Sequence, residues 1–283
     1  MREIQYDDVV TAIKNVIIHC GTVLPVDAYD AIKEAHDNEK SPVAKEVLAQ
    51  LLTNADIAKN EKRPLCQDTG LAVFFVNVGE EVRIIGGLLR AAINEGTEKG
   101  YEEAYLRAST CKPFSRANLK DEIGYNLPAI VHFDIVAGDK IEVEYAAKGG
   151  GSENVSRATV LPPAAGKEGV IAYVKQVISD AGGNPCPPLT VGVGIGGTFE
   201  KAAISSKHSL FRTLGSVNED EEISQLEQDI KLELNKLGIG AMGMGGTETV
   251  LAVHIESNPC HIASLPVSVN VQCHSSRHAH ITI

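Results

Sequence analysis

Residues 63–78 read RPLCQDTGLAVFFVNV, a short polar turn followed by an apolar run. The run Leu71–Val78 has the length and the β-branched and aromatic content of a buried strand. At the mouth of this strand the turn carries a thiol at Cys66, an amide at Gln67 and a carboxylate at Asp68. Such a turn can supply a soft metal ligand with an acid or base beside it. An ordinary loop cysteine and turn aspartate are the alternative interpretation.

Outward from this strand, helical and strand patterns are mixed rather than regularly alternating. We therefore predict an α+β fold, in which a mainly helical region 1–60 is followed by a mixed sheet with flanking helices, within one domain spanning 1–283. Further helices are predicted over 84–106, 168–179 and 220–237, strands over 189–195, 249–255 and 267–271, and a hairpin of strands 129–135 and 140–147 turned at 138–139.

The composition limits the class of protein. The chain has 283 residues, 43% of them hydrophobic, and a formal net charge of -11. This acidic balance argues against a general affinity for nucleic acid or anionic membranes, because both need a basic surface. Since the sequence opens without a basic and then apolar leader pattern, we expect a cytoplasmic protein.

Cysteines, histidines and glycines offer several candidate sites. In a reducing compartment the six cysteines are expected to be buried thiols, metal ligands or catalytic groups rather than disulfides. Five of the nine histidines follow residue 250 and could form a zinc site with Cys260 and Cys273, although no standard zinc spacing is present. The run Gly192–Gly197 resembles a dinucleotide loop in composition but not in glycine spacing.

Four short sequence motifs occur in a specific order along the chain. After Cys66–Gly70 come KGGGS at 148–152, Cys186–Pro188 leading into Gly194–Thr198, and Cys273. In this order they resemble the alpha subunit of the iron-sulfur-dependent hydro-lyases, the family of class I fumarate hydratase and L-tartrate dehydratase. The resemblance extends from about residue 60 onward.

The resemblance implies a 4Fe-4S cluster held by Cys66, Cys186 and Cys273, with one iron not ligated by protein. Three thiolates fix three irons, and an open fourth iron can act as a Lewis acid. Cys20 and Cys111 match no ligand position. Cys260 also matches none, but it could be mistaken for Cys273 as the third cluster ligand.

The resemblance also implies a substrate site. Asp68 would be the catalytic acid or base, and Arg107 would grip a carboxylate bidentately. His261 would reach the substrate of a neighbouring copy. The substrate-binding residues carried over in this way are Gln67, Arg107, Gly149, Gly150 and His261.

Single-chain members of the family carry a further domain that supplies additional cationic side chains. We therefore expect a two-subunit enzyme with a separate beta subunit and a homodimer of alpha chains within a heterotetramer. Fumarate, hydrated to malate, is the first expected substrate and L-tartrate the second. An iron-sulfur redox protein and a zinc-binding interaction module are the alternatives from other classes.

Overall fold

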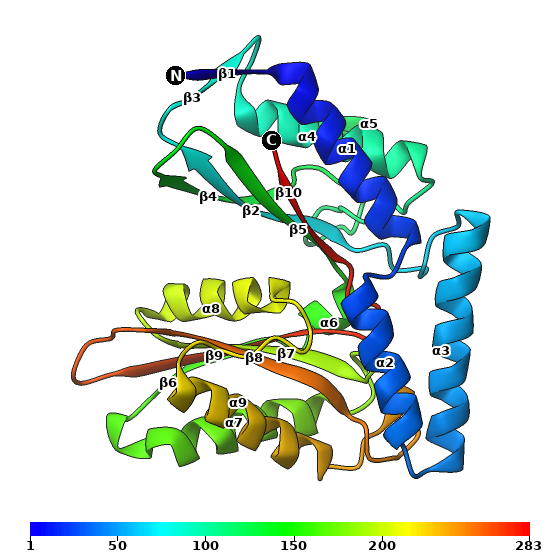
Figure 1. Cartoon of the computed structure of the whole chain (residues 1–283), viewed down its shortest axis with the longest axis vertical. Coiled ribbons are helices and arrows are strands. Elements are labelled where there is room, and N and C mark those ends of the chain that lie inside the picture. The colour runs from blue at the N-terminus through cyan, green and yellow to red at the C-terminus, as the bar shows by residue number, and fades with distance from the viewer. The chain divides into compact units, whose positions relative to one another are not determined.

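The computed structural model describes residues 1–283, and the chain forms two units, each with its own hydrophobic core (Figure 1). Unit 1 comprises Met1–Pro25, Ala55–Gly149 and Arg277–Ile283, and unit 2 comprises Val26–Asn54 and Gly150–Ser276. Helices and sheets occur in both units, which confirms the α+β class. The helical region 1–60 contributes to both units, and the single domain over 1–283 stays a prediction.

Unit 1 is built on a mixed four-stranded sheet in the order β10-β5-β2-β4. Strand β2 is parallel to β4 and antiparallel to β5, and β10 is antiparallel to β5. A separate parallel pair joins β1 to β3. The elements of unit 1 are β1 (Arg2–Gln5), α1 (Tyr6–Thr22), β2 (Leu71–Gly79), β3 (Val82–Ile85), α4 (Leu89–Glu103), α5 (Lys120–Ile123), β4 (Ile130–Val136), β5 (Ile141–Lys148) and β10 (His278–Thr282).

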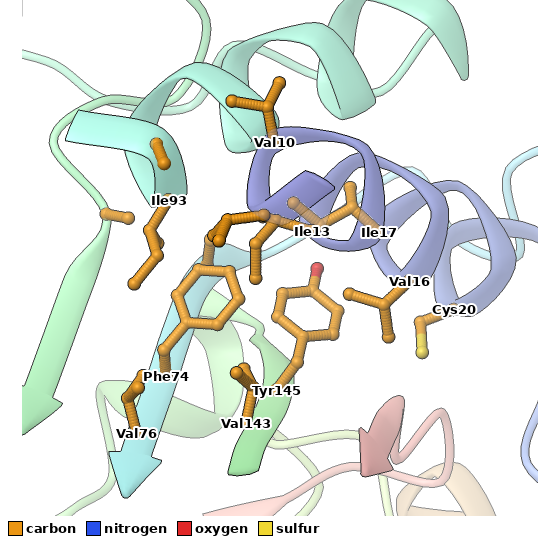
Figure 2. Packing of buried hydrophobic residues seen from close by; sticks show 14 of the residues in the cluster. Val10, Ile13, Val16, Ile17, Cys20, Phe74, Val76, Ile93, Val143 and Tyr145 are labelled. Carbon is orange, nitrogen blue, oxygen red and sulfur yellow. The ribbon is translucent and has the colours of Figure 1, made fainter. Parts of the chain in front are cut away.

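The core of unit 1 forms where helix α1 lies on this sheet. Asp7 and Asp8 stabilise the first turn of α1, because their negative charges interact favourably with the positive end of the helix dipole. One face of the helix carries the apolar side chains Ile13 and Ile17, which Figure 2 shows over the ring of Tyr145 and beside Phe74. The apolar stretch Tyr6–Asn38 is by length and composition sufficient to cross a membrane. It is divided into two helices, and the apolar face of α1 is buried in this core.

The predicted hairpin of 129–135 and 140–147 is wrong, although both strands exist. Strand β2 lies between β4 and β5, so the two strands do not pair with each other. The connection passes the end of β2, where Gly79 donates its N–H to Lys140 O at 2.8 Å. A Cβ on Gly79 would lie 2.4 Å from Gly138 O, so only glycine permits this crossing. Two adjacent alternating patterns cannot reveal a strand inserted from another part of the chain.

The helix predicted over 84–106 is also shorter than expected. Residues Val82–Ile85 form strand β3, which pairs with β1, and the helix begins only at Leu89. The pair Gly86–Gly87 separates the two elements, because glycine is unfavourable inside a helix.

Unit 2 contains a second four-stranded sheet, in the order β6-β9-β7-β8. Helix α8 covers one face, and α7 and α9 cover the other (Figure 1). Asp220 caps α9 by accepting the N–H groups of Glu222 and Ile223. The elements of unit 2 are α2 (Val26–Asn38), α3 (Pro42–Glu61, whose last part belongs to unit 1), α6 (Gly150–Glu153), β6 (Arg157–Leu161), α7 (Gly166–Ala181), β7 (Leu189–Gly196), α8 (Phe199–His208), α9 (Glu221–Asn235), β8 (Val250–Asn258) and β9 (Leu265–Gln272).

The glycine run that resembled a dinucleotide loop lies in strand β7. A Cβ on Gly192 would lie 2.1 Å from Ser206 O, and one on Gly194 would lie 2.0 Å from Ala202 O. Both oxygens belong to α8, so the missing side chains let this helix approach the sheet closely. The run serves helix–sheet packing.

Candidate functional site

The turn Cys66–Gly70 lies directly before strand β2 in unit 1. Gly70 has φ +77, and a Cβ there would lie 2.8 Å from the backbone of Ala147 on the neighbouring strand β5. Strand pairing places Leu71 opposite Lys148, the first residue of KGGGS. The turn and the first part of this glycine-rich segment are therefore neighbours, although some eighty residues separate them in the sequence.

The chemistry-bearing side chains of this turn are accessible to solvent. Gln67 is exposed, and Cys66 and Asp68 are half-buried. The Cys66 thiol donates to Gln67 Oε1 at 3.3 Å. Asp68 Oδ1 accepts the N–H of Gly70 at 3.0 Å, a local turn in which the side chain replaces a backbone acceptor. The carboxylate of Asp68 is thus held in place by the turn that it helps to form.

Arg107 is joined to the same turn through the backbone. Its N–H donates to Thr69 Oγ1 at 2.8 Å, and the Thr69 hydroxyl donates to Arg107 O at 3.4 Å. Thr69 is buried, whereas the Arg107 side chain is exposed. The backbone of Arg107 is therefore fixed beside the turn that carries Cys66 and Asp68, and the guanidinium of Arg107 stays exposed to solvent.

Buried polar groups support the turn from the interior of unit 1. Gly70 O accepts from the Tyr101 hydroxyl at 2.9 Å and from Asn126 Nδ2 at 2.7 Å. Asn126 Oδ1 accepts in turn from Ser109 N at 3.0 Å and from Thr110 Oγ1 at 3.1 Å. Burial raises the pKa of Tyr101, so this phenol stays a neutral donor. The network fixes the turn to the loop that carries Arg107.

One member of this network lies far along the chain. Arg277 Nη2 donates to the carbonyl oxygen of Asp68 at 2.8 Å. Arg277, Tyr101 and Asn126 were not predicted as site residues from the sequence. Only Arg277 has a local signal, since it is the single arginine in the histidine-rich segment after Cys273.

Unit 2 brings together Cys186, Cys273 and the second part of KGGGS. Cys186 follows helix α7 with φ +56, and its carbonyl accepts the N–H of His274 at 3.2 Å. Cys273 comes directly after strand β9, and both cysteines are half-buried. A Cβ on Gly151 would lie 3.5 Å from Asn184 O, two residues before Cys186. Gly150, at the start of α6, lies next to this turn.

His261 lies elsewhere in unit 2. It is exposed in the turn between β8 and β9, where its Nδ1 accepts the N–H of Ala263 at 3.2 Å. Strand β9 separates it from Cys273, and eight extended residues span about 26 Å. His261 therefore does not join Cys186 and Cys273 within one chain.

The remaining cysteines and histidines occupy different environments. None of the six cysteines forms a disulfide bond. Cys20 is buried in α1, where burial raises its pKa to about 12, and Cys260 is exposed and donates to Ser264 O at 3.3 Å. His254 is buried with Nδ1 3.2 Å from Ser209 O. Within each unit, no group of three His, Cys, Asp or Glu side chains is arranged as metal ligands.

Comparison with known proteins decides the family. Residues 10–282 match the profile of the fumarate hydratase (Fumerase) family. The chain belongs to this family. It is 41% identical over 258 residues to a protein of Methanocaldococcus jannaschii provisionally named L(+)-tartrate dehydratase subunit alpha, with 90% of each chain covered.

A second relative comes from Escherichia coli K12. The L(+)-tartrate dehydratase subunit alpha of this strain is 35% identical over 260 residues, which cover 91% of this chain and 84% of the relative. These matches confirm the resemblance found in the sequence. The Fumerase member is a hydro-lyase alpha subunit, as the sequence predicted.

Proposed function

We propose that this Fumerase member is the alpha subunit of a two-subunit enzyme that removes water from, or adds it to, a C4 dicarboxylate. The observation that carries the proposal is the match over 90% of both chains with the M. jannaschii protein named as a tartrate dehydratase subunit. We place L(+)-tartrate first for this reason. Fumarate, which the sequence analysis placed first, is the second candidate because of the description of the family.

The residues gathered in unit 1 support a hydro-lyase site. Dehydration takes a proton from one carbon and a hydroxyl from its neighbour, so the enzyme needs an acid or base and cations for two carboxylates. Asp68 presents a half-buried carboxylate as the acid or base. The exposed guanidinium of Arg107 suits bidentate binding of a carboxylate. The amide of Gln67 and the N–H of Gly149 would orient the substrate. For Gly150, which belongs to unit 2, the same role is proposed from the family resemblance alone.

The cofactor proposed for this family member is a 4Fe-4S cluster on Cys66, Cys186 and Cys273. The donors fit, since all three thiols are half-buried and outside disulfide bonds, and thiolate is the ligand of such clusters. Cys20 fits poorly, because a ligand must lose its proton and burial raises the pKa of this thiol to about 12. When bound, the open iron of the cluster would supply a Lewis acid for the departing hydroxyl.

A beta subunit is part of the proposal. Both relatives are named as alpha subunits, and one exposed arginine is too few cations for a substrate with two carboxylates. A dimer of alpha chains is proposed as well, because His261 lies about 26 Å along strand β9 from Cys273 and could serve only another copy. We place the complex in the cytoplasm, where cysteines stay reduced.

The test is anaerobic co-expression with the beta subunit, followed by iron and sulfide analysis and assays with L(+)-tartrate, fumarate and malate. We expect roughly four irons and four sulfides per alpha chain. Replacing Cys66, Cys186 or Cys273 by serine should abolish cluster binding, whereas Cys20→Ser and Cys111→Ser should retain it. If Cys260→Ser loses the cluster and Cys273→Ser keeps it, the third ligand is misassigned.

The assays separate the two substrates. Dehydration of L(+)-tartrate faster than hydration of fumarate supports the first candidate. Full activity from the alpha chain alone would contradict the two-subunit proposal. A loaded complex that is inactive with every dicarboxylate would contradict the proposed function itself.

A further inference from the structure

Arg277 is an unusual residue in unit 1. It follows Cys273 by four positions, precedes strand β10, and is only 1% exposed. It is the largest of the fully buried side chains. Its own carbonyl accepts the N–H of Ala147 at 3.0 Å, which fixes its backbone to the end of β5. A guanidinium stays charged in a protein, so this position holds a permanent buried cation.

Three buried neighbours of Arg277 do not neutralise its charge. Cys20, Tyr101 and Tyr145 all interact electrostatically with Arg277, and all three are buried. Figure 2 shows the sulfur of Cys20 and the hydroxyl of Tyr145 in the core below helix α1. Burial raises the pKa of each of the three groups, to about 12 for Cys20, so the thiol and both phenols keep their protons.

Only part of the hydrogen-bonding capacity of Arg277 is used. Nη2 donates to Asp68 O, whereas Nε and Nη1 are buried without a hydrogen-bond partner. Unsatisfied donors on a buried charge are costly, and native proteins pair nearly all of them with protein groups, ordered water or a ligand. Arg212 in unit 2 is the contrast, because its guanidinium bonds to Glu227 and Ser216 of the same chain. Arg277 therefore has buried N–H donors that a bound anion could accept.

We propose that Arg277 is an anion-binding residue of the Asp68 site, and that its buried Nε–H, on the guanidinium edge shared with Nη2, donates to an anionic acceptor bound beside this turn. The inference rests on the proposed function, which supplies two anionic hydrogen-bond acceptors, a substrate carboxylate and a sulfide or thiolate of the cluster. Since Nη2 holds the Asp68 carbonyl, the bound anion lies within the width of one guanidinium group from that residue. Arg277 thereby also positions Asp68.

The test compares Arg277→Lys with the wild type in the anaerobic, cluster-loaded complex. Lysine keeps the charge but cannot hold Asp68 O and an anion in the same geometry. If the acceptor is the substrate, KM for the dicarboxylate should rise about 10- to 100-fold with an unchanged cluster spectrum. If the acceptor is cluster sulfide, the reduction potential and the electron paramagnetic resonance spectrum of the reduced cluster should change while KM changes less than about 3-fold.

The matched control is Arg212→Lys, since this arginine is paired within unit 2 and is assigned no role in the site. It should alter neither KM nor the cluster spectrum. Arg277→Lys behaving like Arg212→Lys in an active complex would overturn the inference and leave the proposed function intact. A wild-type complex that binds no cluster and has no activity would instead refute the function.

A second measurement uses the wild type and does not depend on folding of a variant. The Nε–H resonance of Arg277 can be followed in arginine-labelled protein without cluster, with cluster, and with cluster plus L(+)-tartrate. We expect the resonance to shift and its hydrogen exchange to slow at the step that adds the acceptor. A resonance that is unchanged in all three states would overturn the inference.

Discussion

Two buried charged residues, one in each unit, have opposite surroundings. In unit 2, Glu39 is 5% exposed and its carboxylate accepts four backbone N–H groups, from Lys40, Ser41, Thr247 and Glu248. In unit 1, Arg277 is 1% exposed, but two of its nitrogens have no partner. A charge whose partners all come from the chain stabilises the fold. A charge with unused donors can bind a partner from outside the chain, as we propose for Arg277.

The largest expected effect concerns the turn that Arg277 supports. Asp68→Asn should lower turnover by about 10²- to 10⁴-fold, because the acid or base is lost. Asparagine keeps an oxygen for the N–H of Gly70, so the stability and the cluster content should stay near those of the wild type. Steady-state kinetics measure turnover, urea unfolding measures stability, and iron and sulfide analysis measures cluster content. Normal turnover would remove Asp68 from the mechanism.

Glu39→Ala should show the reverse behaviour. Loss of the carboxylate leaves four backbone donors without their acceptor, and we expect the free energy of unfolding to fall by about 3 kcal/mol. Turnover of the folded enzyme should be unchanged. The control is Glu219→Ala, which removes an exposed carboxylate. If Glu39→Ala impairs turnover without destabilising the protein, the contrast between the two charges is wrong.

Gly194→Ala tests the structural role of unit 2 further. The added methyl group would meet Ala202 O at 2.0 Å, so helix α8 must move away from strand β7. We expect a loss of about 2 kcal/mol in the free energy of unfolding, as for other overpacked sites. Thermal unfolding measures it. An unchanged melting temperature would show that the glycine is not needed for packing.

The smallest effect is the pH dependence of the Glu39 contribution. Burial alone would raise the pKa of this carboxyl, but the four backbone N–H groups outweigh burial and hold the pKa below its usual value of 4.5. The stabilisation is therefore present above pH 4.5 and is lost as the pH falls through the lower folded-state pKa. Urea unfolding of wild type and Glu39→Gln should give stabilities that converge below pH 4.5. A difference that persists into stronger acid would contradict the assignment.

The sequence predicted local elements well where one pattern decides the structure. Helix α1 and strand β7 follow directly from runs of apolar residues. The position of β2 between β4 and β5 was not predictable, because it depends on which distant strand pairs with which edge.

The candidate site divides in the same way. The turn Cys66–Gly70 was recognisable as a sequence motif. Its neighbour Lys148 is placed beside it by the pairing of strands β2 and β5. Asn126 and Arg277 act on the turn through hydrogen bonds from remote parts of the chain. No local periodicity marks such contacts, and a lone arginine or asparagine in a sequence has many ordinary explanations.

The composition of unit 1 from three stretches of chain has a consequence for synthesis on the ribosome. Residues 55–149 emerge long before Arg277–Ile283, yet β10 completes the sheet of this unit and Arg277 completes the support of Asp68. All of unit 2 has been translated before Arg277 is added, since its last residue is Ser276. The turn that carries Cys66 and Asp68 can therefore reach its final form only after unit 2 has been translated. Maturation of the site therefore follows translation of unit 2.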